Sequence, residues 1–255
     1  MPPLDLEVPV FSPASAQVAL ARAGRLELNR AGSYPKGGLT PELSDVQSLS
    51  AVPVPLRIMI RPRGPPEDSP DFIYSTSELE EMRNDVQRFK DSGYLRTDRD
   101  DGFVFGILRA RDGAEGGLLV DVERNSELVR LASPFKCVFH RAFDEVLGGG
   151  GSSPEVDETV RSVKACGFDG VLTSGGPGSA VGNLDMLSRV VLAAATENIE
   201  VIVGGGVRSS NARVLRERLP RREGSRVWSH SSCLTKQSAD AVDVDELNSL
   251  GDTLS

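Results

Sequence analysis

The chain has 255 residues, of which 39% are hydrophobic, enough to bury a large core as two ordinary domains or as one α/β barrel. It carries 29 basic and 37 acidic side chains, a net charge of −8, with no basic stripe interleaved with aromatic residues. Neither nucleic acid nor an anionic membrane is therefore an expected partner. The N-terminus lacks the basic region of a signal peptide, no apolar run reaches the ~20 residues of a membrane span, and three cysteines are too few for a disulfide framework. We expect a cytoplasmic protein.

Short runs rich in Val, Ile, Leu and Phe recur along the chain, each followed by a turn and by a segment with helical periodicity. The eight predicted strands cover residues 4–11, 25–29, 56–62, 102–108, 136–140, 170–175, 200–206 and 226–232. Between them lie predicted helices, for example one that Ser75 or Ser77 caps and Gly93 ends, and one over residues 152–167. Eight such units predict a single α/β domain over residues 1–255, a (β/α)8 TIM barrel rather than a doubly wound sheet.

Three segments depart from this regular pattern. Residues 63–72 are rich in proline and acid, and residues 148–153 are a glycine run, so both are expected to be surface insertions. The acidic tail, residues 238–255, is expected to form either a short final helix or a frayed end. The eighth helix of the barrel is therefore expected to be short.

The only two histidines, His140 and His230, both fall at the ends of predicted strands, where TIM barrels hold their active sites. If His140 points into the barrel, then Val138 does too, while Cys137 faces the helices as a small buried hydrophobe. Each histidine alone could be a hydrogen-bonded core residue. Two histidines at the same rim favour a functional role.

Arg141 and Asp144 follow His140 within four residues, so Asp144 could pair with Arg141 or with an imidazole N–H. A structural ion pair and a catalytic orienting residue are both open. On the early strands, Glu7 and Glu27 lie in apolar runs where a charge is costly unless paired. Their expected partner is Arg61, either in a structural network or in a substrate site.

Glycine-rich turns follow the sixth and seventh strands, at residues 173–180 and 204–211. Their backbone N–H groups could hold an anion, and Gly205 and Gly206 are the candidates closest to a helix start. Ordinary turn chemistry also favours glycine here and remains the alternative.

The strand ends can be read together as "LELN…PKGGLTP", "IRPRG", "FHRAFD", "LTSG", "GGGVRSSN" and "SHSS". From about residue 4 to residue 232 this set resembles the CutC family, named for copper homeostasis. The resemblance implies a TIM barrel, a homo-oligomer, and a pocket at the C-terminal rim that handles Cu(I). The positions that match the family pocket are Glu7, Glu27, Arg61, His140, Arg141, Asp144, Thr173, Ser174 and His230.

The chain departs from the family where thiols are expected. Many relatives carry cysteine in the first strand and at the end of the second, where this sequence has Pro9 and Asn29. Thiolates select Cu(I), so copper binding is expected to be weak. The candidate copper ligands that remain are His230 and Cys233, the only thiol predicted at the rim.

Two functions stay open. The first is a cytosolic copper homeostasis protein that binds Cu(I) without catalysis. The second is an enzyme that acts on a small anionic metabolite, with Glu7 or Glu27 as the base, His140 as the acid and Asp144 as a further catalytic candidate. The candidate substrate-binding residues are Arg61, Arg141, Thr173, Ser174, Gly205, Gly206 and Ser231. A barrel that serves only as a scaffold explains the charges at the rim poorly.

Overall fold

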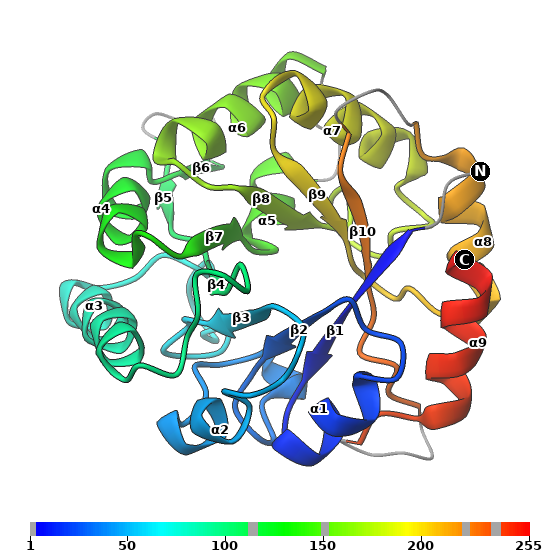
Figure 1. Ribbon diagram of the computed structural model, residues 1–255. Coiled ribbons are helices and arrows are strands. Elements are labelled where there is room, and N and C mark those ends of the chain that lie inside the picture. The colour runs from blue at the N-terminus through cyan, green and yellow to red at the C-terminus, as the bar shows by residue number, and fades with distance from the viewer. Residues whose placement is uncertain (1–3, 112–116, 149–152, 221–224, 236–240) are drawn as a thin grey trace.

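Eight parallel strands close into a barrel in the computed structural model, which describes residues 4–111, 117–148, 153–220, 225–235 and 241–255 (Figure 1). The barrel strands are β1 (Asp5–Val10), β2 (Arg25–Leu28), β3 (Leu56–Met59), β4 (Gly102–Phe105), β7 (Lys136–Phe139), β8 (Gly170–Thr173), β9 (Glu200–Val203) and β10 (Val227–His230). Neighbours around the barrel follow the order of the chain, and β1 pairs with β10 to close it. The predicted TIM barrel is confirmed.

Helices surround the barrel on its outside (Figure 1). They are α1 (Pro13–Ala19), α2 (Leu43–Ser48), α3 (Thr76–Asp91), α4 (Val122–Ala132), α5 (Ala142–Leu147), α6 (Ser153–Cys166), α7 (Leu184–Thr196), α8 (Ser209–Arg218) and α9 (Val244–Leu254), with a short 3-10 helix η1 (Tyr34–Lys36). Ser75 caps α3 in a capping box with Glu78, and Gly93 follows its end with a positive φ. None of the helices in the described part of the chain has the length and apolar character of a membrane span.

One predicted strand differs from the structure, and one predicted insertion is not described by it. Residues 102–108 were expected to form one strand, but β4 ends at Phe105, and β5 (Leu108–Ala110) forms an antiparallel ribbon with β6 (Leu118–Val120). Three-residue strands are too short to give a periodic signal. The expected insertion at 148–153 falls largely outside the described residues.

The C-terminal segment is not a frayed end. Helix α9 has 11 residues and buries Leu247, Leu250 and Leu254. Asp243 caps it by accepting hydrogen bonds from the N–H groups of the first turn, and Asp245 and Glu246 lie in that turn, where the helix dipole favours acidic residues. Leu4 donates a backbone hydrogen bond to the carbonyl of Leu254, which brings the two ends of the chain side by side (Figure 1).

The interior of the barrel is apolar on one side and polar on the other. Six strands each contribute one apolar side chain to an inner cluster, namely Met59, Val104, Val138, Leu172, Ile202 and Trp228. Strands β1 and β2 instead direct Glu7 and Glu27 inward, while Leu6 and Val8 pack against the helices. Cys137 lies in the outer core, as predicted. Buried carboxylates therefore lie on the β1 and β2 side of the barrel interior, and apolar side chains lie on the other.

Candidate functional site

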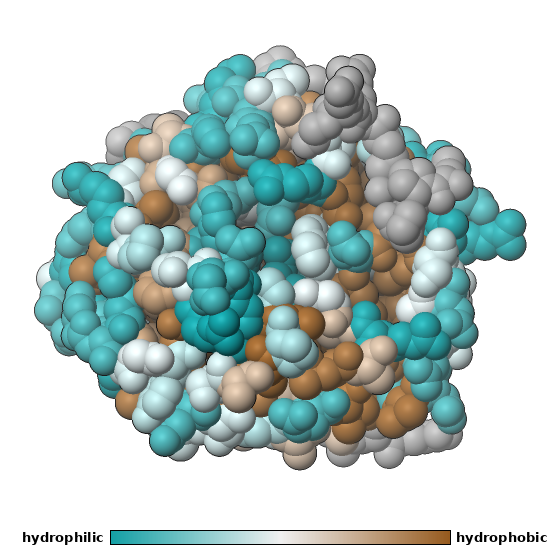
Figure 2. Space-filling view, viewed as in Figure 1, coloured by the Kyte–Doolittle hydropathy of each residue, from teal (hydrophilic) through white to brown (hydrophobic). Residues whose placement is uncertain are grey.

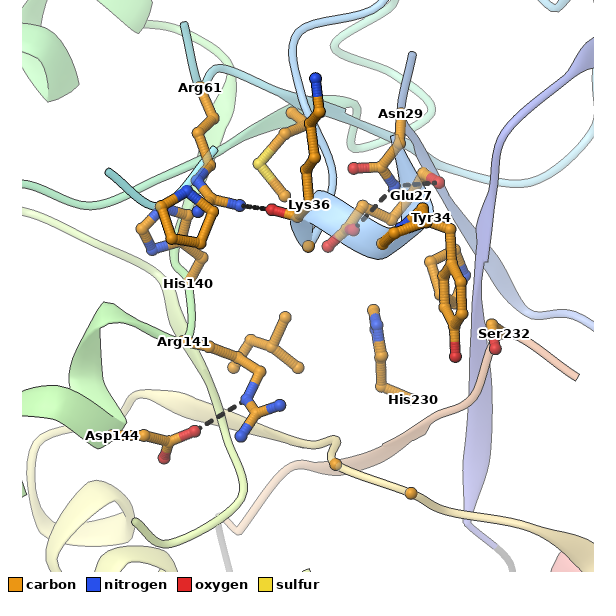
Figure 3. Close-up of a pocket in the computed structure, with 18 of the residues that line it drawn as sticks. Glu27, Asn29, Tyr34, Lys36, Arg61, His140, Arg141, Asp144, His230 and Ser232 are labelled. Carbon is orange, nitrogen blue, oxygen red and sulfur yellow. Dashed lines mark hydrogen bonds and ion pairs between the residues drawn. The ribbon is translucent and has the colours of Figure 1, made fainter. Parts of the chain in front are cut away.

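A cavity of about 590 Å³ opens at the C-terminal ends of the barrel strands, where TIM barrels hold their active sites (Figure 3). Both histidines line it. The residues singled out in the sequence that line it are Glu27, Arg61, His140, Arg141, Asp144, Gly205, Gly206, His230 and Ser231. Glu7 lies beneath the cavity, and Thr173 and Ser174 lie behind its wall.

Glu7 and His230 form a buried ion pair beneath the cavity. The Nδ1 atom of His230 lies 2.7 Å from Oε1 of Glu7, and Arg25 donates from Nε to the other oxygen of Glu7. Nη1 of Arg25 donates to Glu200 at 2.7 Å. Burial alone would raise the pKa of Glu7, but Arg25 and His230 lower it to about 2. Glu7 is therefore ionised at neutral pH.

Glu27 is the second carboxylate near His230. Its Oε1 accepts a hydrogen bond from Asn29 at 3.0 Å, and its buried Oε2 has no partner among the described residues. Burial raises the pKa of Glu27, and the Glu7 carboxylate adds to the rise, although the charge of His230 opposes it. Burial would lower the pKa of His230, but the hydrogen bond to Glu7 and the charges of both glutamates raise it. The imidazolium form of His230 is thus favoured.

His140 has the opposite electrostatic environment. The Ala142 N–H donates to Nδ1 of His140 at 3.2 Å, which assigns the ring proton to Nε2. Burial and the nearby Arg61 lower the pKa of His140 to about 3. Its Nε2 is buried and has no partner in the described part of the chain, and its ring lies 4.6 Å from that of Phe72. His140 is thus a neutral part of the wall.

Asp144 organises the loop after β8. Its carboxylate accepts hydrogen bonds from the Thr173 hydroxyl at 2.5 Å, the Ser174 hydroxyl at 2.9 Å and the backbone N–H of Ser174 and Gly176. It also pairs with Nε of Arg141 at 2.8 Å. Because these donors occupy both oxygens, Asp144 is placed to hold the loop and Arg141 in position.

The expected pairing of Arg61 with Glu7 or Glu27 is wrong. Arg61 pairs with Asp71 at 2.6 Å, and Glu7 pairs with Arg25. The register explains this difference, because the Cα of Glu7 lies opposite that of Arg25, whereas Arg61 lies two residues beyond the end of β3. The sequence shows both arginines, but it does not show how far along the barrel axis each one lies.

Arg61 instead joins two loops that wall the cavity. Its Nη1 donates to the carbonyls of Lys36 at 2.5 Å and Gly38 at 3.2 Å, which hold the segment around η1. Its guanidinium lies 4.9 Å from the ring centroid of Phe72, the last residue of the 63–72 insertion. This insertion therefore closes one side of the cavity, as Pro65, Asp71 and Phe72 line it.

Arg141 and the loop after β9 offer donors to a negatively charged group. The Arg141 side chain is 43% exposed and points into the cavity, toward the side where His230 lies (Figure 3). Gly205 has a φ of 101°, and a Cβ there would lie 2.6 Å from that of Ser174. The N–H groups of Gly205 and Gly206 donate no hydrogen bond to any described residue.

Several residues that line the cavity were not predicted from the sequence. Arg208 is one of them, and its Nη1 donates to the Val207 carbonyl and to the Ser231 hydroxyl. Its position two residues after the glycine run of a strand-to-helix loop is a signal that could have identified it. The other unpredicted lining residues include Tyr34, Lys36 and Ser232, of which the last two lie in the "PKGGLTP" and "SHSS" segments.

The donor atoms around the cavity do not fit Cu(I). Cys233 is buried in the outer core, with Sγ 3.7 Å from the Ser231 carbonyl, and no cysteine of the described chain lines the cavity. Burial raises the pKa of the Cys233 thiol to about 11, which disfavours the thiolate. Pro9 and Asn29 both line the cavity. Thiolate ligands are therefore absent from the described part of this site.

Oxygen and nitrogen donors do gather beneath the cavity. Potential ligand atoms of Glu7, Glu27 and His230 lie within 4.8 Å of one another. Two of the three are already engaged, however, because Arg25 and His230 both hold Glu7. The cluster is organised as an ion-pair network around His230.

The fold and the cavity define a TIM barrel with a polar pocket at its C-terminal rim. The chain belongs to the CutC family, whose sequence profile matches residues 4–225. It is 33% identical over 243 residues to a CutC family protein of Sinorhizobium medicae, covering 95% of this chain and 86% of that one. It is also 33% identical over 207 residues to the human copper homeostasis protein cutC homolog, covering 81% and 66% of the two chains.

Solved structures agree with this assignment. The crystal structure of the CutC protein from Streptococcus agalactiae has a TM-score of 0.71 and 23% identity, and the match covers 90% of this chain and 98% of that chain. A deoxyribose phosphate aldolase from Aeropyrum pernix, at 17% identity and a TM-score of 0.53, covers 89% and 85% and shares the fold. The predicted family is confirmed.

Proposed function

We propose that the cavity binds a small anionic metabolite and that His230, paired with Glu7, exchanges a proton with it. The observation that carries this proposal is the 2.7 Å contact between buried Glu7 and an imidazole that lines the cavity. A carboxylate on one ring nitrogen leaves the other nitrogen to act on a ligand. This is the enzymatic alternative of the two functions that the sequence left open.

The negative group of the metabolite is held by Arg141 and by the loop at Gly205 and Gly206. Arg141 is fixed through Nε by Asp144 and through Nη2 by the Ser174 hydroxyl, at 2.8 and 2.6 Å. A guanidinium that is held on one edge and open on the other is suited to a carboxylate or a phosphate. The backbone N–H groups of the glycine loop add donors without a side chain that would block approach.

The protein's part in the proton transfer follows from the two carboxylates near the imidazole. Glu7 keeps a proton on Nδ1 of His230, so Nε2 is the atom that gives a proton to the ligand or takes one from it. Glu27 lies within 4.8 Å and stabilises the imidazolium form. The reaction class is acid–base catalysis on a small anion, and the fold alone does not name the reaction.

The role in copper homeostasis belongs to the same proposal. The human and mouse relatives are named copper homeostasis proteins, which supports a copper-related role. The chain's three cysteines are unpaired, which agrees with the reducing cytoplasm. We propose that Cu(I) is at most a weakly bound cargo, since the cavity offers it imidazole and carboxylate, and that the protein is the homo-oligomer that the family resemblance implies.

A thermal-shift screen of phosphorylated and carboxylated metabolites, with Cu(I) as a separate arm, tests this proposal. A ligand that binds only the native state at ~100 times its Kd should raise Tm by about 5 to 10 °C in a chain of this size. The rise should disappear in Arg141→Met, because the anion loses its principal charge partner.

Arg213→Met is the matched control, because Arg213 is an exposed arginine on α8 that pairs only with Glu217 among the described residues. This variant should keep the full response. Stabilisation by Cu(I) alone, with no metabolite response in the wild type, would contradict the proposal.

A further inference from the structure

A second polar cavity, of about 370 Å³, lies at the opposite end of the barrel. Its lining includes Arg25 and Arg57 at the starts of β2 and β3, Glu200 at the start of β9, and Trp228 in β10. Figure 2 shows the molecule from this side, with hydrophilic side chains gathered near the middle of the face. The rim cavity lies at the far end of the strands, so the two cavities are separate.

Arg57 is a buried charge without an acidic partner. The residue is only 4% exposed, and no described carboxylate forms an ion pair with it. Its Nη1 donates to the backbone carbonyl of Asp100, and its buried Nε has no partner in the described structure. A buried guanidinium that lacks a counter-charge is costly.

Four carboxylates also line the cavity, those of Asp5, Asp100, Asp169 and Glu200, but among the described residues none of them forms an ion pair with Arg57. Arg25 uses Glu7 and Glu200, and Lys136 uses Asp169 at 3.0 Å. Arg25 also has a buried Nη2 without a partner within the described ranges. Burial and the like charge of Arg25 lower the pKa of Arg57, and the more distant charges of Glu200, Glu7 and Asp169 offset this only in part. Two guanidinium groups therefore leave buried N–H donors unsatisfied beside one cavity.

We propose that this cavity is a second anion site, in which a small inorganic anion, chloride or an oxyanion such as phosphate, binds between Arg57 and Arg25. Water could satisfy the buried N–H groups but would leave Arg57 without an ion-pair partner. An anion does both. The site is independent of the proposed reaction at the rim.

Arg57 is the residue to change, because Arg25 also contacts Glu7 and through it His230. Tm is measured in sodium gluconate and then with added sodium chloride or sodium phosphate at constant ionic strength. Wild type should show a saturable rise of about 5 to 10 °C at ~100 times Kd. Arg57→Met should lose that rise and should melt higher than wild type in gluconate alone.

Two control variants separate this site from other effects. Lys136→Met removes a cation from the same cavity that already has a partner, so its response should match wild type. Arg141→Met removes the rim donor, so a response that survives there and vanishes in Arg57→Met belongs to the second site. A response lost in Arg141→Met and kept in Arg57→Met would instead assign the anion to the rim and overturn the proposal.

A measurement that needs no variant keeps the proposal falsifiable if Arg57→Met does not fold. Crystals of the wild-type protein soaked in bromide, and separately in selenate, should give an anomalous difference peak between the Arg57 and Arg25 guanidinium groups. An empty cavity in both data sets would overturn the proposal.

Discussion

At the scale of single residues, the two histidines of the chain share a cavity but differ in charge. His230 lies near two carboxylates, whereas His140 lies beside Arg61, so their pKa values shift in opposite directions. We expect NMR titration of the ring nitrogens to give a pKa above 6.5 for His230 and to find His140 neutral throughout the neutral range. In Glu7→Gln, the pKa of His230 should fall. An unchanged titration would show that Glu7 does not hold the imidazole.

Glu7 and His230 also make the free energy of unfolding depend on pH. Glu7 has a pKa of about 2 in the folded protein and an ordinary value of 4.5, so its contribution is present above pH 4.5 and is lost as pH falls toward 2. The pKa of His230 is raised, so its contribution is complete below pH 6.5 and is lost as pH rises through the folded value. Chemical unfolding across this range should show the loss at low pH in wild type and a weaker one in Glu7→Gln.

Asp144 is the residue whose loss should most disturb the wall of the pocket. Asp144→Asn should lower the free energy of unfolding by about 3 kcal/mol, because an amide cannot accept from all the donors and leaves Arg141 without its counter-charge. Glu145→Gln changes the exposed neighbour on the same helix and should have little effect. Equal urea midpoints for the two variants would contradict the role of Asp144.

At the scale of the elements, Arg61 joins the segment around η1 to the 63–72 insertion. Arg61→Met and Asp71→Asn should each destabilise the protein by about 3 kcal/mol, and their effects should be strongly non-additive because they remove one pair. Arg61→Met and Glu7→Gln should add, since the two residues are not partners. A double-mutant cycle that couples Arg61 to Glu7 instead would restore the pairing expected from the sequence.

Strands β1 and β2 explain the weak copper binding that we expect. The Cα of Pro9 pairs with that of Glu27, and Asn29 directly follows the end of β2 and lines the same cavity as Pro9. Pro9→Cys combined with Asn29→Cys should place two thiols at this end of the barrel and increase Cu(I) affinity, measured against a competing chelator under reducing conditions. Cys233→Ser should leave the weak wild-type binding unchanged, because Cys233 lies in the core. No gain in the double variant would show that the two positions do not converge.

At the scale of the whole molecule, the strands and the pocket end of the barrel were predictable from the sequence. Buried parallel strands read as continuous apolar runs, and their ends mark the rim, which is why His140, Arg141 and His230 could be chosen in advance. The side-chain partners were not predictable. Arg25 and Arg61 look alike in the sequence, and only the register of β1 and β2 shows that Arg25 lies level with Glu7.

The central claim is that Arg141 holds an anion in the rim cavity beside His230, whose protonated form strengthens the binding. Calorimetric titration with sulfate, which keeps its charge between about pH 5 and pH 9, tests it directly. It is done in the Arg57→Met background so that the second cavity does not contribute. Affinity should fall at least about tenfold as pH rises through the pKa of His230, and this dependence should be absent in His230→Gln. Sulfate binding that is independent of pH and unaffected by both His230→Gln and Arg141→Met would contradict the claim.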